Sequence, residues 1–331
     1  MRWILALLSS LVVVLACPFV SAKPEHSLRI ATLAPKNSAW GKVFRTWQKA
    51  VDQKTKGRLS VEVYYNAVQG DEDSMVGKMK TGQIDGAALT SVGLSRIERD
   101  VLVLQLPGVV DDWDALGKAR KAVGSELEKR FKAQGFTLTG WGDVGLVRQM
   151  SKGFAVRRPS DLRGKSPAVW RNEPMGPTVY TKIGGVVSVP VSPMEVLPAL
   201  RAHKINVVSA PALAAEQLQW TPYLDHVASR SSVCAIGGSV IRTKALEALP
   251  ADLRKVLDDM QERLNKATKN RIRRLDEAAY KRLTKKMKIV DLSQDDVKAW
   301  RKVLLPAVKQ LSQGTLDKTL VEKVLKATGK S

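Results

Sequence analysis

The sequence contains few residues whose types and spacing match known catalytic or metal-binding sites. Its three histidines, His26, His203 and His226, lie far apart and show no paired metal-ligand spacing. The glycines of residues 140–145 match the Gly-x-Gly-x-x-Gly dinucleotide fingerprint, but that fingerprint should open a helix, and residues 146–150 have the pattern of a strand. We therefore interpret these glycines as a turn between two parts of the protein. The sequence also has no nucleophile elbow or phosphate loop, so we predict no enzyme, no cofactor and no metal site.

The remaining candidates suggest binding rather than catalysis. Three short polar side chains follow predicted strands in the first half of the chain: Thr32, Thr90 and Ser91. Open α/β sheets bind ligands at the carboxyl ends of their strands, so we expect these three residues at a cleft. Four aromatic residues are expected at the edges of that cleft: Tyr65, Trp141, Trp170 and Trp220. A single aromatic of this kind is more often a core residue, but together they predict an apolar pocket.

The first 22 residues have the three parts of a secretory signal peptide. Arg2 supplies a positive charge, residues 4–16 are apolar apart from two serines, and residues 20–22 (Val-Ser-Ala) form a cleavage site. The apolar run is too short for a lasting membrane helix. We predict cleavage after Ala22 and export to the periplasm. The alternative is a lipoprotein cleavage site that ends in Cys17, although the order of Leu and Val before it fits that motif poorly.

Removal of this signal would leave Cys234 as the remaining cysteine, so an intramolecular disulfide is excluded even in an oxidising compartment. Cys234 lies in an apolar, strand-like run at residues 233–236. We predict a buried, unreactive thiol rather than a nucleophile.

The chain is strongly basic, with 54 Lys and Arg against 32 Asp and Glu and a formal net charge of +22. Nucleic-acid binding would need a basic stripe with interleaved aromatics or a recognised motif, and neither is present. Much of the excess lies on helical sequence such as residues 269–274 and 285–288. We interpret these residues as a solvated helix face. The alternative is attraction to an anionic membrane surface or to an acidic partner.

Strands and helices alternate in the first half of the chain. Apolar periodicity and turn signals predict strands at 28–32, 59–65 and 84–89, and helices that begin after a cap at Asn37 or Ser38 and at Glu72. This order predicts a parallel α/β sheet.

The same alternation restarts after Gly153. It predicts strands at 168–170, 186–191 and 205–209, with helices at 174–183 and after Ser192. From Pro250 to about Met287 the pattern is helical without a stop signal, and at about 1.5 Å per residue such a helix is long enough to span two lobes. A last helix is expected at 294–311, interrupted by Pro306.

Six fragments resemble, in the same order, the substrate-binding proteins of tripartite ATP-independent periplasmic (TRAP) transporters. They are residues 38–41 with 56–64, 79–87, 104–107, 160–165, 189–190 and 193–200. The resemblance extends over residues 27–321. It implies a type II periplasmic-binding-protein-like α/β fold, with two lobes, a ligand cleft between them and a long helix that crosses both. We expect residues 27–150 with about 241–268 in lobe I, and 151–240 with about 269–331 in lobe II.

The resemblance also implies a carboxylate clamp, and this sequence departs from it. The family places an Arg in the strand after its Asp-Leu-Lys-Gly element, where the Arg grips the ligand's carboxylate with two hydrogen bonds. That position is Ala168 here. A second expected Arg is Val147, with Arg148 one step away and on the opposite face of a regular strand. The family's Glu and Asn in the next strand are Ser209 and Ala210.

Burying a ligand carboxylate without a cationic partner costs several kcal/mol of desolvation free energy, or raises the pKa of the carboxyl group so that it becomes neutral. We therefore predict a cleft more apolar than the family norm, which captures a small organic ligand more apolar than a short dicarboxylate for the membrane subunits of a TRAP-type transporter. Two alternatives remain at this stage. Arg171 or Arg148 restores the binding of an organic acid, or the chain is a ligand sensor of the same fold.

Overall fold

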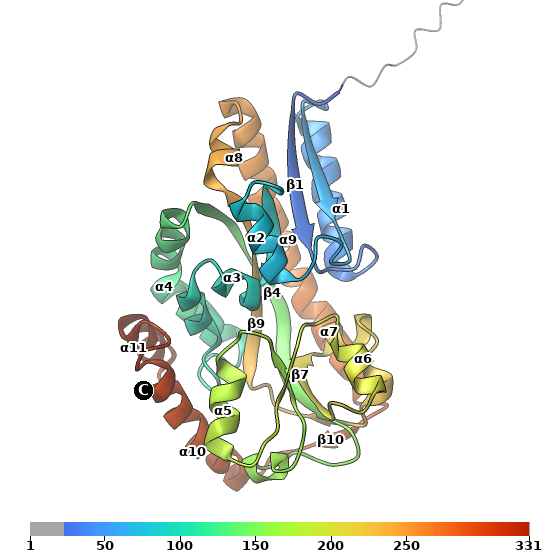
Figure 1. Cartoon of the computed structure of the whole chain (residues 1–331), viewed down its shortest axis with the longest axis vertical. Coiled ribbons are helices and arrows are strands. Elements are labelled where there is room, and N and C mark those ends of the chain that lie inside the picture. The colour runs from blue at the N-terminus through green and yellow to red at the C-terminus, as the bar shows by residue number, and fades with distance from the viewer. Residues whose placement is uncertain (1–22, 331) are drawn as a thin grey trace, which may run out of the picture.

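The computed structural model describes residues 23–330 and shows two lobes joined through the middle of the molecule (Figure 1). The predicted signal peptide and Cys17 lie outside the described residues. The strands are β1 His26–Thr32, β2 Leu59–Tyr64, β3 Gly86–Thr90, β4 Phe136–Ser151, β5 Ala168–Trp170, β6 Val189–Val191, β7 Val207–Pro211, β8 His226–Ala228, β9 Val233–Arg242 and β10 Lys288–Val290. The α-helices are α1 Ala39–Lys54, α2 Glu72–Lys80, α3 Ser91–Ser95, α4 Trp113–Ala133, α5 Met175–Ile183, α6 Val196–Arg201, α7 Ala212–Gln217, α8 Thr243–Glu247, α9 Ala251–Leu283, α10 Gln294–Leu311 and α11 Lys318–Thr328. Three 3-10 helices complete the set: η1 Arg99–Gln105, η2 Pro159–Leu162 and η3 Thr221–Tyr223.

A single sheet extends through both lobes. Its strands follow the order β10-β8-β4-β9-β3-β1-β2, and β7 also pairs with β4. β1, β2 and β3 are parallel, as predicted, whereas β9 runs antiparallel to both β3 and β4. In lobe II, β5 and β6 form a separate parallel pair. The predicted α/β class is confirmed, and the sheet that joins the lobes is mixed rather than purely parallel.

The two lobes share the long strand β4. Its residues from Phe136 to Val147 pair with β9, and the end from Val147 to Ser151 pairs with β7. β4 and β9 run side by side through the middle of the molecule (Figure 1). These strands are the connection on which a relative motion of the lobes would bend.

The glycines of residues 140–145 lie inside β4, so the prediction of a turn there was wrong. The pairing of β4 with β9 contains two register shifts, one before Gly140 and one before Gly145. A Cβ at Gly140 would overlap the side chain of Asn265 on α9, and one at Gly145 would collide with Asp276. The glycines therefore let α9 pack directly against the strand, a role that needs neither a turn nor a nucleotide.

α9 crosses both lobes, as predicted. It is 33 residues long and packs against α1 in lobe I, against β4 and against α7 in lobe II. Asp276 fixes it to the sheet: its Oδ2 accepts a hydrogen bond of 2.9 Å from the amide of Leu146, and its Oδ1 accepts one of 3.0 Å from the amide of Leu213.

The C-terminal helices return from lobe II to lobe I. α10 packs on α5, and it continues through Pro306, which was expected to interrupt it. Packing of Ala307, Val308 and Leu311 supports the helix beyond the proline, since tertiary burial provides most helical stability. α11 packs against α4 and η1 of lobe I rather than within lobe II, where residues 269–331 were expected.

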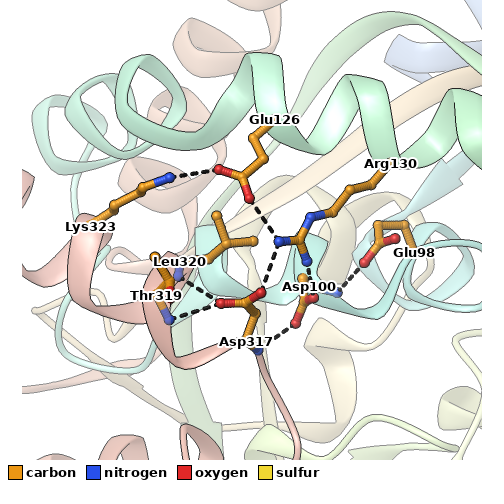
Figure 2. Close-up of polar contacts among 8 residues, drawn as sticks. All are labelled: Glu98, Asp100, Glu126, Arg130, Asp317, Thr319, Leu320 and Lys323. Carbon is orange, nitrogen blue, oxygen red and sulfur yellow. Dashed lines mark hydrogen bonds and ion pairs between the residues drawn. The ribbon is translucent and has the colours of Figure 1, made fainter.

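Arg130 holds α11 in that place (Figure 2). Its guanidinium on α4 donates hydrogen bonds to Asp100 at 2.7 Å and to Asp317 at 2.8 Å, and it also bonds Glu126 at 2.7 Å. Lys323 of α11 pairs with the same Glu126 at 2.7 Å. One cation of lobe I thereby joins three carboxylates, one of which caps the start of α11.

Candidate ligand-binding site

A cavity of about 980 Å³ lies between the lobes. Its lobe I wall includes Thr32 at the end of β1 and Thr90 at the end of β3, and its lobe II wall includes Trp170 at the end of β5 and Pro211 at the end of β7. These are carboxyl ends of strands, the expected position for a ligand in an open α/β sheet. The volume is that of a site for a small organic molecule.

Aromatic side chains make much of this wall. They are Trp40, Phe44, Trp141, Trp170, Tyr180, Trp220 and Trp300. The rings of Trp170 and Trp220 pack against each other with their centroids 6.3 Å apart, which fixes a hydrophobic wall in lobe II. Trp40 and Phe44 were not expected here, because their helical spacing in α1 reads equally well as a core-facing stripe.

Most of the residues that the sequence suggested for the site do line this cavity. They are Thr32, Thr90, Ser91, Trp141, Arg148, Ala168, Trp170, Ser209 and Ala210, together with Trp220.

Tyr65 and Arg171 do not line the cavity. Tyr65 is buried in the core formed by β1, β2 and α1, and its hydroxyl donates a hydrogen bond of 2.7 Å to Oε1 of Gln48. Arg171 is exposed and pairs with Glu195 at 2.7 Å. Tyr65 therefore does not face the cavity, and Arg171 does not replace the missing carboxylate-binding Arg in this structure.

The polar groups of the lobe I wall are largely occupied by local hydrogen bonds. Thr90 donates to Glu72 from its amide at 2.5 Å and from its hydroxyl at 2.6 Å, and the hydroxyl of Thr32 accepts a bond from the amide of Ala34. Burial raises the pKa of Glu72, and the hydrogen bonds from Thr90 and Gly93 offset part of that rise. Thr32 and Thr90 therefore shape this end of the cavity and retain acceptor capacity for a ligand hydroxyl.

One buried guanidinium in the wall lacks a carboxylate partner. Arg148 is 6% exposed, and its guanidinium lies over the ring of Tyr280 at 3.8 Å from the centroid. Within residues 23–330 no ion pair involves Arg148, and its Nε has no hydrogen-bond partner. Its hydrogen bond to the carbonyl of Leu146 is long, at 3.5 Å. A buried cation with unused donors is the group in this wall best suited to an anion.

The acid Asp143, in contrast, is fully neutralised. It is 2% exposed and lies between Arg120 and Arg273, each at 2.6 Å. Two cations on one buried carboxylate leave it unavailable to a ligand.

Cys234 is fully buried in β9, as the sequence predicted, and burial raises the pKa of its thiol. No cluster of His, Cys, Asp and Glu within residues 23–330 could hold a metal ion. In the same part of the chain, no helix has the length and apolar character to cross a membrane.

Residues 30–314 match the family model of the bacterial extracellular solute-binding proteins, family 7. The chain belongs to this family. A solute-binding protein from Verminephrobacter eiseniae is 27% identical over 187 residues, which are 56% of this chain and 55% of that protein. The chain therefore spans little more than half of the length of this relative.

Solved structures of binding proteins have the same fold. One is a sugar acid binding protein from Advenella mimigardefordensis in complex with galactonate, with a TM-score of 0.85, 18% identity, and coverage of 93% of this chain and 99% of that one. Another is a TRAP periplasmic solute-binding protein from Shewanella oneidensis with bound succinate. It has a TM-score of 0.84 and 17% identity, and the match covers 93% of this chain and 100% of that one. The predicted TRAP binding-protein resemblance and the type II periplasmic-binding fold are confirmed, and these relatives are binding proteins rather than enzymes.

Proposed function

We propose that this protein captures an amphipathic organic acid, with an apolar body larger than that of a short dicarboxylate, and delivers it to the membrane subunits of a TRAP-type transporter. The observation that carries the proposal is the composition of the cavity wall. Seven aromatic side chains line it, and among the described residues of the wall the one buried cation without a carboxylate partner is Arg148. A ligand that matches this wall has one anionic end and an apolar remainder.

The absence of the clamp favours an apolar body. Ala168 contributes a methyl group where the resemblance places a guanidinium, and the exposed Arg171 is held by Glu195 outside the cavity. A dicarboxylate would bring two charges into a wall in which Arg148 is the buried cation, whereas Arg230 and Arg301 also line the cavity but are exposed to solvent. Desolvating the second charge would cost several kcal/mol.

Arg148 favours an acid over a neutral ligand. Its stack on Tyr280 fixes the plane of the guanidinium, and its unpaired Nε needs an acceptor that a ligand carboxylate would supply. The related proteins that were solved with galactonate and succinate also bind carboxylates, and this agreement supports an organic acid here.

Native mass spectrometry of the protein as purified tests the ligand class. We expect a bound organic acid, which the Arg148→Gln variant loses and the matched Arg171→Gln variant retains. Retention of the same acid by Arg148→Gln would remove the proposed anchor. A short dicarboxylate bound to the native protein would contradict the apolar body.

Export through the predicted signal peptide, with cleavage after Ala22 rather than lipidation at Cys17, is part of this proposal. The family is extracytoplasmic, which supports it. The N-terminal sequence and mass of the protein secreted by its natural host would show whether the mature chain begins at residue 23 or at a lipid-modified Cys17.

The alternative to a solvated helix face, contact with an anionic membrane surface, can also be tested. Arg271, Arg274, Lys281 and Lys285 are all exposed, and their spacing of three, seven and four residues places them on one face of the long helix and its immediate extension. Within residues 23–330 none of the four is in an ion pair. Co-sedimentation with phosphatidylglycerol vesicles should fall when these four are changed to Gln, and equal binding by the quadruple variant would refute the contact.

A further inference from the structure

Glu173 is a carboxyl group in the cavity wall that the proposed function leaves unused. It lies in the turn between β5 and α5, is 9% exposed, and also lines a smaller cavity of about 450 Å³ between the lobes. Nothing in the sequence marks Glu173, because an acid beside a proline before a helix looks like an ordinary helix-start residue. Its burial on a ligand-facing wall gives it a different significance.

Backbone amides, rather than a cation, hold the carboxylate of Glu173. Its Oε1 accepts a hydrogen bond of 2.6 Å from the amide of Met175, and its Oε2 accepts one of 3.2 Å from the amide of Gly176. Both amides belong to the first turn of α5, so the helix terminus balances part of the charge. Arg96, which shares the smaller cavity with Glu173, pairs with Asp73 at 2.5 Å. In the described part of the chain, Glu173 has no ion-pair partner.

Three of the other four acids of the main cavity wall are better compensated, and the fourth, Asp112, is exposed to solvent and accepts one hydrogen bond, from the amide of Ala115. Asp143 has two arginine partners, and Asp111 pairs with Lys330. Glu72 lacks a cation but accepts three hydrogen bonds, two from Thr90 and one from the amide of Gly93. Glu173 accepts two. A second anion near α5 would therefore meet a buried negative charge that two backbone amides compensate only in part.

The charge state of Glu173 changes near neutral pH. Burial raises its pKa to about 7, against the stabilising effect of the two backbone hydrogen bonds. The titratable and charged groups around it are Tyr180 of α5, in the same wall, and Arg96 and Arg99 of lobe I, across the smaller cavity. Burial raises the pKa of Tyr180 to about 12, so it stays neutral throughout the range in which Glu173 titrates.

We propose that Glu173 is a specificity-determining residue that repels a second negative charge on the ligand, so that the protein selects singly charged acids over dicarboxylates. The inference rests on the proposed function and adds the reason for which the far end of the ligand must be uncharged. Coulomb repulsion across about 8 Å at an effective dielectric constant of about 20 changes a dissociation constant by more than tenfold. A single carboxylate at this position is therefore sufficient for the selection.

Calorimetric titration with hexanoate and adipate tests the inference, because these acids share a six-carbon chain and differ in one carboxylate. The quantity to compare is the affinity for adipate divided by the affinity for hexanoate. At pH 8.5 we expect this ratio to be about tenfold higher in Glu173→Gln than in the native protein. The amide oxygen of Gln can still accept the bond from Met175, so the start of α5 is retained. Glu195→Gln is the matched control, since it removes an exposed carboxylate of the same lobe outside the cavity and should leave the ratio unchanged.

A pH series on the native protein supplies a second measurement that requires no variant. Both acids stay ionised between pH 6.5 and 8.5, whereas Glu173 changes its charge, so the affinity for adipate relative to hexanoate should rise as the pH falls. Suppose that hexanoate binds, but that neither the substitution nor the pH changes the affinity for adipate relative to hexanoate. That result would overturn this inference and leave the proposed function standing. Failure of both acids to bind the native protein and the variant would overturn the proposed function and this inference together.

Discussion

Asn172 of lobe II donates a hydrogen bond of 2.8 Å from its side-chain amide to Oδ2 of Asp73 in lobe I. A second contact of this kind joins the amide of Ala39 in lobe I to Oε1 of Gln217 in lobe II at 3.0 Å. Both bonds cross between the lobes without involving a ligand. They hold the two lobes together in this structure, and opening the cleft would have to break them.

Replacing Asn172 by Gly should weaken every ligand by a similar factor. Asn172 has a φ of +64°, a left-handed conformation that Gly adopts without strain, so this change removes the amide and keeps the turn. An exposed hydrogen bond to a charged group contributes about 1 kcal/mol, so its loss should weaken ligand affinity about fivefold. Calorimetry with two different ligands would measure the effect, with Asn37→Ala as control because Asn37 bonds Arg45 within lobe I. A loss for one ligand and none for the other would contradict a role in closure.

Ligand binding should make the protein more compact. The lobes are joined by β4, β9 and the crossing helix α9, so rotation about these elements would open or close the cavity between them. Small-angle scattering should give a smaller radius of gyration with a confirmed ligand than without it. Identical scattering profiles in both states would exclude hinge closure.

Much of the fold could be predicted from the sequence, because local signals and packing agree there. α2 begins at the predicted residue, β5 occupies its predicted three positions, and the uninterrupted pattern after Pro250 forms the long helix α9. The glycines of residues 140–145 failed as a turn signal, since a glycine that relieves a close helix–strand contact looks the same in sequence as one that makes a turn.

The site was less predictable, because a single sequence does not give the direction of a side chain. Tyr65 follows β2 by one residue and packs into the core instead of the cavity, and Arg171 leaves β5 by one residue and turns outward to Glu195. Glu173 carries no motif, and its importance comes from burial that only the packing of α5 creates. Ser209 and Ala210 were found because the resemblance, rather than periodicity, pointed to them.

Substitution of Arg130 by Met should weaken the attachment of α11 to lobe I, while the buried Leu320, Val321 and Val324 still hold the helix there. Asp100, Asp317 and Glu126 would lose their shared cation, and the uncompensated carboxylates should lower the free energy of unfolding by about 1–2 kcal/mol, given their partial exposure. Thermal or urea unfolding would measure this. Arg282→Met, which removes an exposed cation with Glu216 as its partner, should cost less. Equal losses for the two variants would show that the network in Figure 2 adds nothing beyond an ordinary surface pair.

The stability of the native protein should fall as pH rises from about 4.5 to about 7, in part because of Glu173. Burial raises the pKa of this residue from its ordinary value of 4.5 to about 7, so in that window the folded protein holds a proton that the unfolded chain releases. At about 1.4 kcal/mol per unit of pKa, the loss amounts to at most about 3 kcal/mol. Urea unfolding at several pH values should show that Glu173→Gln lacks this component. Parallel stability curves for the variant and the native protein would contradict a buried Glu173 that titrates in this range.

Restoring an Arg at position 168 should bring back the binding of short dicarboxylates. Ala168 lines the cavity, so the longer side chain of Ala168→Arg can extend into that space and form the missing bidentate pair. Titration with succinate should show a gain of tenfold or more over the native protein. Arg171→Ala should leave the binding of apolar acids nearly intact. No gain in Ala168→Arg, in a variant that unfolds like the native protein, would mean that the clamp position does not limit carboxylate binding.

The ligand preference of the native protein is the sharpest test of an amphipathic ligand. Calorimetry should compare succinate with an amphipathic monocarboxylate such as octanoate. We predict that octanoate binds and that succinate binds about 30-fold to 4,000-fold more weakly, the range expected when a buried charge pair worth about 2–5 kcal/mol is missing. Tight binding of succinate that disappears in Arg171→Ala would contradict the account, because it would show that the clamp had moved three residues along the chain.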